Sequence, residues 1–195
     1  MPSGLQVMNE FTSESLKTAW SHEYQRKGIP SSFRKDPTKP LVEFMAWCRD
    51  KGLSGSAADI GCGQGRNSFF LAQEGFKVIA VDIFCYKHIV EKEKQKHYRS
   101  ELWRSLKPGG YYFISLASKN DGFYGPLLAQ SPDNSRNLIV DPHAKIPSLL
   151  YSQDELCREF SDLFRVVEAR ENFSISPMYG KEYPRAVLNC IFQKN

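Results

Sequence analysis

A glycine-dense stretch in the first half of the chain limits its fold more than any other feature. Residues 57–67 read Ala-Ala-Asp-Ile-Gly-Cys-Gly-Gln-Gly-Arg-Asn, with glycines at Gly61, Gly63 and Gly65. Glycine has no side chain to keep a ligand away and adopts positive φ readily, so such a turn between a strand and a helix lets the backbone approach a ligand closely. The spacing predicts a nucleotide-cofactor pocket of the G-x-G-x-G type, which differs by one residue from the dinucleotide fingerprint G-x-G-x-x-G.

An acidic residue ends the next apolar run. Val78-Ile79-Ala80-Val81 reads as a strand that leads to Asp82. With a strand at 57–60 and a helix at 66–74, this strand forms a β-α-β unit whose two strands are parallel and whose crossover is right-handed. Because ligands bind at the carboxyl ends of parallel strands, we expect Asp82 beside the glycine loop, where its carboxylate accepts hydrogen bonds from a ribose diol.

Length and composition are those of one globular domain. The 195 residues suffice for a single α/β domain, which we divide into an N-terminal cap segment, 1–36, and a core, 37–195. No apolar run approaches the ~20 residues of a membrane span, and no secretory signal pattern begins the chain, so we expect a cytoplasmic protein without a membrane partner. Five cysteines, an odd number without C-x-x-C spacing, indicate neither a disulfide framework nor a metal site.

The charge pattern does not indicate nucleic-acid binding. The formal net charge of +4 is small, and the lysines of 87–107 alternate with Glu91, Glu93 and Glu101. No stripe of one sign results, and the run is interpreted as a solvated helix face.

A second motif lies downstream of the glycine loop. Residues 102–114 read Leu-Trp-Arg-Ser-Leu-Lys-Pro-Gly-Gly-Tyr-Tyr-Phe-Ile, a helix, an L-K-P-G-G turn and a strand. Together the two motifs resemble those of the class I S-adenosylmethionine-dependent methyltransferases, and the resemblance extends over about residues 40–193. Trp20, Tyr24 and Ile29-Pro30 resemble the small-molecule branch related to tellurite-resistance and thiopurine methyltransferases.

The resemblance implies a fold, a cofactor and a set of site residues. The fold is α/β, a Rossmann-like sheet that is mostly parallel with an antiparallel C-terminal hairpin and is shortened in the middle. The cofactor is S-adenosylmethionine, the partner is a small-molecule methyl acceptor, and Arg34 is a candidate for the methionine carboxylate, although a surface role is commoner for such an arginine. The implied cofactor-binding residues are Asp59, Gly61, Cys62, Gly63, Gly65, Asn67, Asp82 and Arg34.

The chain departs from this family directly after Asp82. The family continues there with a helix, a third strand, an adenine-contacting loop and a further helix, whereas here Ile83–Val90 already resembles its fourth strand and the helix beyond. Neighbouring parallel strands need a connection of a dozen residues or more. Four outcomes follow: one fused strand over 78–86 that leads into a helix over 87–106, an irregular bend, an exchange of elements within a homodimer, or a segment missing from the sequence. We favour the fused strand.

The remaining elements follow from local signals. Leu16, Ala19, Trp20 and Tyr24 predict a helix over 14–25, and Pro40 predicts the start of the next helix. Gly75 predicts the stop of the helix over 66–74, and Ser152 with Glu155 predicts a capping box that opens a helix over 153–160. We further expect a strand over 111–116, a long loop over 119–148 and a closing hairpin with strands at 164–168 and 186–192.

Methyl transfer from a sulfonium is an in-line displacement that needs positioning more than a strong acid or base. No catalytic residue is therefore assigned; His88, as a general base, and Tyr183 with Arg185 are candidates near the acceptor. We expect a methyltransferase acting on a small molecule. The alternative is a truncated, non-catalytic methyltransferase-fold module that binds the cofactor weakly or not at all. The glycine spacing disfavours a nicotinamide oxidoreductase.

Overall fold

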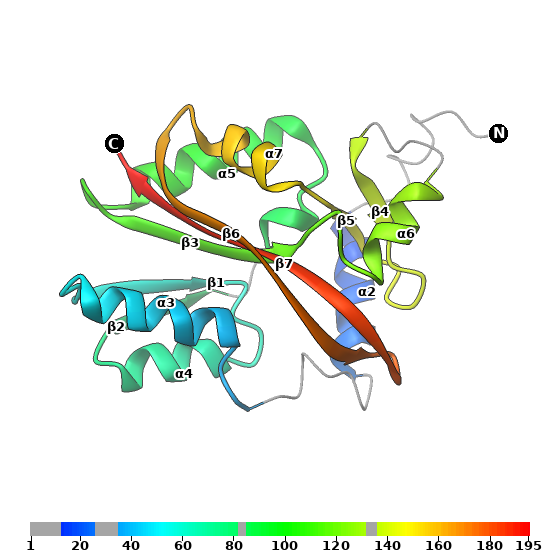
Figure 1. Ribbon diagram of the computed structural model, residues 1–195, viewed down its shortest axis with the longest axis horizontal. Helices are drawn as coiled ribbons and strands as arrows, with labels where there is room; N and C mark the ends of the chain where they lie inside the picture. Colours follow the sequence, from blue (N-terminus) through cyan, green and yellow to red (C-terminus); the bar gives the residue numbers. More distant parts are fainter. Residues whose placement is uncertain (1–12, 26–34, 82–84, 132–135) are drawn as a thin grey trace. The chain divides into compact units, whose positions relative to one another are not determined.

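The computed structural model describes residues 13–25, 35–81, 85–131 and 136–195 (Figure 1). Its contacts divide the chain into two compact units, residues 28–85 and residues 1–27 together with 86–195, which are described separately. In chain order the helices and strands are α2 (Ser13–Gln25), α3 (Lys39–Asp50), β1 (Ser56–Ile60), α4 (Arg66–Gln73), β2 (Lys77–Val81), the 3₁₀ helix η1 (Tyr86–His88), α5 (Lys92–Ser105), β3 (Tyr111–Ala117), α6 (Tyr124–Ala129), β4 (Leu138–Val140), β5 (Pro147–Leu149), α7 (Gln153–Phe160), β6 (Phe164–Met178) and β7 (Lys181–Lys194).

The unit of residues 28–85 contains the predicted β-α-β motif. β1 and β2 pair in parallel, from Ser56 opposite Lys77 to Ile60 opposite Val81. Helix α4 ends in a Schellman motif, because the N–H groups of Gly75 and Phe76 donate to the carbonyls of Ala72 (3.0 Å) and Leu71 (3.1 Å). The predicted stop at Gly75, whose φ is +90°, is thus the observed one.

One face of the β1–β2 pair is packed. Leu41, Met45 and Cys48 of α3 and Leu71 of α4 form a buried cluster to which Val78 of β2 adds its side chain. Neighbouring strand residues point to opposite faces. Ile79, next along β2, is accordingly 65% exposed.

The second unit is built on an antiparallel sheet with the order β3-β7-β6. Phe160 of α7 packs on it, with ring centroids 4.7 Å from Phe192 of β7 and 5.6 Å from Tyr112 of β3. The strands β6 and β7 are joined by the two-residue turn Tyr179–Gly180, whose φ values of 50° and 80° are both positive, as a type I′ hairpin turn requires. β4 and β5 form a separate antiparallel pair.

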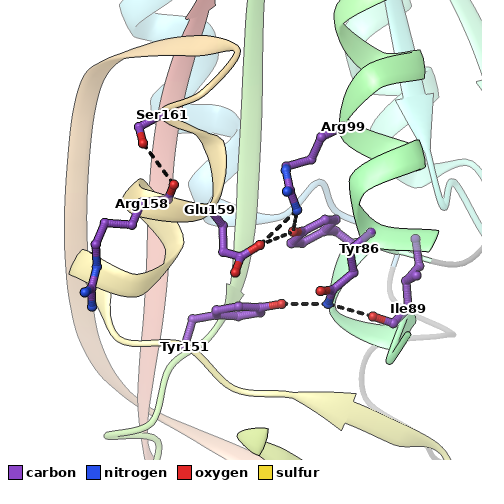
Figure 2. A network of polar contacts seen from close by, with 8 residues as sticks. Tyr86, Ile89, Arg99, Tyr151, Arg158, Glu159 and Ser161 are labelled. Carbon is purple, nitrogen blue, oxygen red and sulfur yellow. Dashed lines mark hydrogen bonds and ion pairs between the residues drawn. The ribbon is translucent and has the colours of Figure 1, made fainter. Parts of the chain in front are cut away.

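A partly buried polar network fixes η1 in this unit (Figure 2). Arg99 of α5 donates to the hydroxyl of Tyr86 (2.7 Å) and to the carboxylate of Glu159 on α7 (2.9 Å). The Tyr86 hydroxyl also donates to Glu159 (3.2 Å). Next to it, Gln95 donates to the carbonyl of Ile89 (2.7 Å) and to the hydroxyl of Tyr151 (2.9 Å). Side chains of α5 and α7 therefore hold η1 and the residue that follows it.

The α/β fold class is confirmed, with sheets that are partly parallel and partly antiparallel. The fused strand over 78–86 is wrong: β2 ends at Val81, Tyr86 begins the 3₁₀ helix, and α5 starts only at Lys92 rather than at Lys87. The loop expected over 119–148 contains α6, β4 and β5. In the described ranges no helix is both long and apolar enough to span a membrane.

Candidate cofactor site

The glycine loop forms the whole connection from β1 to α4. β1 ends at Ile60 and α4 begins at Arg66, with Gly65 as its N-cap residue. Gly61, Gly63 and Gly65 have φ values of 78°, 52° and 83°. Each lies in the left-handed region that side-chain-bearing residues seldom adopt. The alternate glycines of the sequence are therefore required by the backbone itself.

Hydrogen bonds tie this loop to the end of β2. The N–H groups of Gly61 and Cys62 donate to the carbonyl of Val81 at 2.7 and 3.3 Å, and the N–H of Gly65 closes the turn on the carbonyl of Cys62 at 2.9 Å. Val81 immediately precedes Asp82. The loop thus contacts the residue before the predicted ribose-binding carboxylate, while Asp82 itself lies outside the described residues, as does Arg34.

Two of the predicted site residues support the loop from the protein side. Asp59 accepts a hydrogen bond from the hydroxyl of Ser68 (2.7 Å), which links the end of β1 to the first turn of α4. Asn67 accepts a hydrogen bond from the N–H of Thr38 (3.1 Å), which links α4 to the start of α3. The supporting partners Ser68 and Thr38 were missed in the sequence, although Ser68 lies one residue beyond the quoted motif.

The shape of the loop is compatible with a cofactor backbone contact. A Cβ placed on Gly65 would meet only the side chain of Phe69, at 3.5 Å, so the space beside this glycine is open. Phe69 itself is 71% exposed. Cys62 lies within the turn, and its Sγ is 3.8 Å from the carbonyl oxygen of Gly63. Between the end of β1 and the start of α4, the loop therefore exposes backbone groups that a ligand can approach.

His88 has a structural environment. Its Nδ1 lies 2.9 Å from the carbonyl of Pro147 and 3.0 Å from the hydroxyl of Ser148, and its ring packs edge-on against Trp20 with centroids 5.1 Å apart. Burial, with a smaller contribution from the charge of Lys87, lowers the pKa of His88 to about 3. The ring is neutral at physiological pH, and its Nδ1–H is directed into the protein.

Arg185 is likewise engaged inside the protein. Its Nε donates to the carboxylate of Asp121 at 2.6 Å, and Asp121 also accepts hydrogen bonds from the N–H groups of Phe123 and Tyr124, both at 3.0 Å. Asp121 thereby accepts two backbone N–H groups where α6 begins. This role was missed in the sequence, where the signal is an aspartate followed by Gly122 at the start of a turn. Tyr183 packs against the apolar cluster around Phe123.

Among the residues that the structure describes, no three His, Cys, Asp or Glu side chains gather as a metal site would require.

Comparison with known proteins identifies the fold. The family model described as "Tellurite resistance protein TehB" matches residues 51–102, which include the glycine loop, β2 and most of α5. No curated protein matches the sequence significantly.

Several solved structures are similar over most of the chain. An S-adenosylmethionine-dependent methyltransferase from Methanosarcina mazei is 15% identical with a TM-score of 0.60, covering 81% of this chain and 98% of its own. One from Anabaena variabilis is 12% identical with a TM-score of 0.61, covering 93% and 94%. TehB from Haemophilus influenzae is 15% identical with a TM-score of 0.51, covering 90% and 66%. The resemblance to the methyltransferases is confirmed, and the chain has their fold.

Proposed function

We propose that this chain, whose fold is that of the S-adenosylmethionine-dependent methyltransferases, binds S-adenosylmethionine at its glycine loop and transfers the methyl group to a small-molecule acceptor. The observation that supports this most is the loop itself, which has three left-handed glycines and is tied through the N–H groups of Gly61 and Cys62 to the carbonyl of Val81, the residue before Asp82. A cytoplasmic location and a dimer, either a simple homodimer or one that exchanges elements between its two chains, accompany the proposal as expectations.

The proposed roles follow from the position of each residue. The backbone of Gly61, Gly63 and Gly65 would contact the methionine end of the cofactor, and Asp82 would bind the ribose hydroxyls. Arg34 is the proposed partner of the methionine carboxylate. Asp59, Cys62 and Asn67 would keep the loop in shape.

S-adenosylmethionine, when bound, supplies a methyl group on a positively charged sulfur. The residues of this chain need only hold the reacting groups in line and keep water out. His88 is not proposed as the general base, because burial lowers its pKa to about 3 and so makes its ring a weak base.

Calorimetric titration with S-adenosylhomocysteine tests the cofactor site. We expect wild-type binding in the micromolar range and a loss of tenfold or more in Gly65→Ala, since alanine is strained at this φ and its methyl group narrows the loop. Gly52→Ala is the matched control: Gly52 also has a positive φ, +64°, its surroundings are open, and it lies just beyond the end of α3, away from the loop. Wild-type binding weaker than millimolar would contradict the proposal.

Asp82→Ala tests the ribose contact. Loss of a charge-assisted hydrogen bond predicts an affinity for S-adenosylhomocysteine lower by about ten- to a hundredfold. Asp50→Ala, at the exposed end of α3, controls for the change in charge. If both variants bind like the wild type, the role of Asp82 is refuted while the glycine-loop site is not.

A second candidate function is a non-catalytic module with the methyltransferase fold. It is favoured by the four residues, 82–85, that separate β2 from η1, and by Ile79, which β2 leaves 65% exposed. A protein that fails to bind S-adenosylhomocysteine yet has an intact mass of 22.3 kDa would support this function. A clearly larger mass would instead indicate a segment absent from the sequence.

A further inference from the structure

One edge of the antiparallel sheet is free. In the part of the chain that the structure describes, β6 lies at the end of the order β3-β7-β6 and pairs only with β7. Toward its tip the β6–β7 hairpin continues past the last residue of β3, Ala117, which pairs with Val187 (Figure 1). The free edge of a strand carries backbone N–H and C=O groups that can pair with a further strand.

Hydrogen bonds of β7 show which residues of β6 point to this edge. The carbonyls of Pro184 and Ala186 accept hydrogen bonds, at 2.8 and 2.9 Å, from N–H groups of the segment that follows β3. These carbonyls therefore point away from β6. Ile175 lies opposite Pro184 and Phe173 lies opposite Ala186, so neither is hydrogen-bonded to β7. The backbone groups of Phe173 and Ile175 are thus directed to the free edge.

This stretch of the edge is apolar and exposed. Phe173 is 71% exposed and Ile175 is 72% exposed. Residues 172–176 contain no charged residue, glycine or proline, although charges and prolines are the usual means by which proteins keep an edge from pairing. Pro177 follows two residues after Ile175, so its nitrogen faces the same edge and interrupts no bond to β7. The apolar stretch is therefore able to pair and has a defined end.

The edge is complementary to itself about Ser174. In an antiparallel pair of two copies related by a two-fold axis at Ser174, Phe173 of each copy lies opposite Ile175 of the other. The backbone groups of these residues face one another, so each of the two pairs exchanges both of its N–H···O bonds. The four apolar side chains then lie on one face of the sheet, as neighbours across the axis.

The neighbouring registers fit less well. With the axis at Phe173, Ile175 would lie opposite Glu171, whose carboxylate is engaged by the amide of Asn120 (3.1 Å). With the axis at Ile175, Phe173 would lie opposite Pro177, which has no N–H to donate. The axis at Ser174 is the register that joins apolar residues to each other and keeps their backbone bonds.

We propose that this protein forms a homodimer in which residues 171–177 of β6 from two copies pair antiparallel about Ser174. The pairing joins two three-stranded sheets into one continuous sheet. A contact made by one strand edge lies at or below the lower end of the roughly 1,200–2,000 Å² that stable interfaces bury, so we expect a weak dimer. The proposal rests on the unit with the antiparallel sheet and requires neither cofactor binding nor methyl transfer.

Sedimentation velocity of the full-length chain, from about 5 µM to about 500 µM, tests the dimer, for which we expect a micromolar dissociation constant. Phe173→Lys and Ile175→Lys should each weaken it at least tenfold, because a lysine on the edge opposes strand pairing. Phe69→Lys is the matched control: Phe69 is also 71% exposed but lies on α4, and its substitution should leave the dimer unchanged. A chain that stays monomeric throughout, or a dimer that the edge lysines do not weaken, would overturn the proposal.

A cysteine at the two-fold axis tests the register. In a Cys85→Ser background, which removes an exposed native thiol, Ser174→Cys places two thiols directly opposite each other, with Cβ atoms about 4.5–5.5 Å apart. Diamide should link them as a disulfide, taking up the two electrons and two protons that the thiols release. Ser176→Cys is the control, because it faces Asn172 of the second copy and lies about 13 Å along the strand from its own counterpart. No link in Ser174→Cys, or equal linking in both variants, would contradict the pairing about Ser174.

Discussion

Acid is expected to destabilise this protein through His88. The folded protein holds this imidazole neutral, with Nδ1–H donating to the carbonyl of Pro147 and the ring packed against Trp20. Burial lowers the pKa of His88 to about 3, from the 6.5 that is usual for histidine. Protonation of the folded state would place a charge where little water can solvate it.

The size and the sign of the effect follow from linkage. Because the folded-state pKa is depressed, the contribution to stability is complete above pH 6.5 and is lost as the pH falls toward 3. Each unit by which the pH falls in this range lowers the free energy of unfolding by about 1.4 kcal/mol, so that about 2 kcal/mol is lost at pH 5.

Urea unfolding of the wild type and of His88→Asn at pH 7.5 and pH 5 measures this loss. The asparagine amide can donate to Pro147 as Nδ1–H does, but it does not titrate. Between pH 7.5 and pH 5, the free energy of unfolding of the wild type should therefore fall by about 2 kcal/mol more than that of this variant. His97→Asn, at an exposed position of α5, should keep the wild-type pH dependence. Parallel losses in wild type and His88→Asn would refute the reasoning.

Three further pairs of substitutions probe the second unit. Gly125→Ala should destabilise this unit by about 1–3 kcal/mol, because the new Cβ would lie 2.5 Å from a backbone carbonyl oxygen. Gly180→Ala has open space around it and should destabilise the unit only through the strain of its positive φ, by about 1 kcal/mol. Thermal unfolding of the two variants compares these losses. Glu159→Leu should lower the free energy of unfolding by about 3 kcal/mol and Arg99→Met by about 1 kcal/mol, both measured by urea unfolding. The difference arises because the Arg99 side chain is 11% exposed and would keep an unpaired buried charge, whereas Glu159 is 39% exposed and can be hydrated. Equal losses would contradict this. Ser152→Ala should cost about 1 kcal/mol by loss of the capping box, with Ser161→Ala, beyond the other end of α7, as the control.

Elements with local signals were predictable from the sequence. Ser152 and Glu155 form the capping box, and α7 has the predicted bounds. Gly75 ends α4, and the glycine loop joins β1 to α4 where the motif placed it. In each case the residues that determine the structure lie within a few positions of one another.

The predictions from sequence are wrong where residues far apart in the chain determine the local structure. Tyr86 was expected to end a strand, but its hydroxyl meets Arg99 and Glu159, which lie 13 and 73 positions away, and it begins a 3₁₀ helix instead. His88 was a candidate base, but it packs beside Pro147, 59 positions away, and burial lowers its pKa to about 3. No local sequence pattern predicts contacts between residues so far apart in the chain.

The closing hairpin illustrates a missed local signal. The strands were expected at 164–168 and 186–192 with a long return between them, whereas β6 and β7 continue to Met178 and Lys181. Tyr179–Gly180 takes the two positive φ values of a tight hairpin turn. The glycine is typical of such turns, but tyrosine in the first position is not, which explains why the turn was not predicted.

That two-residue turn also has a consequence for the order of folding. Once Met178 meets Lys181, each later pair of the ladder, up to Phe164 with Lys194, adds only a short stretch of chain to an already closed loop. The entropic cost of closing loops grows slowly when they lengthen in such small steps. β3 joins β7 across a far longer interval, from Tyr111 to Gln193. The hairpin can therefore zip from its tip before the sheet is complete, and β7 then offers its second edge as a template on which β3 docks.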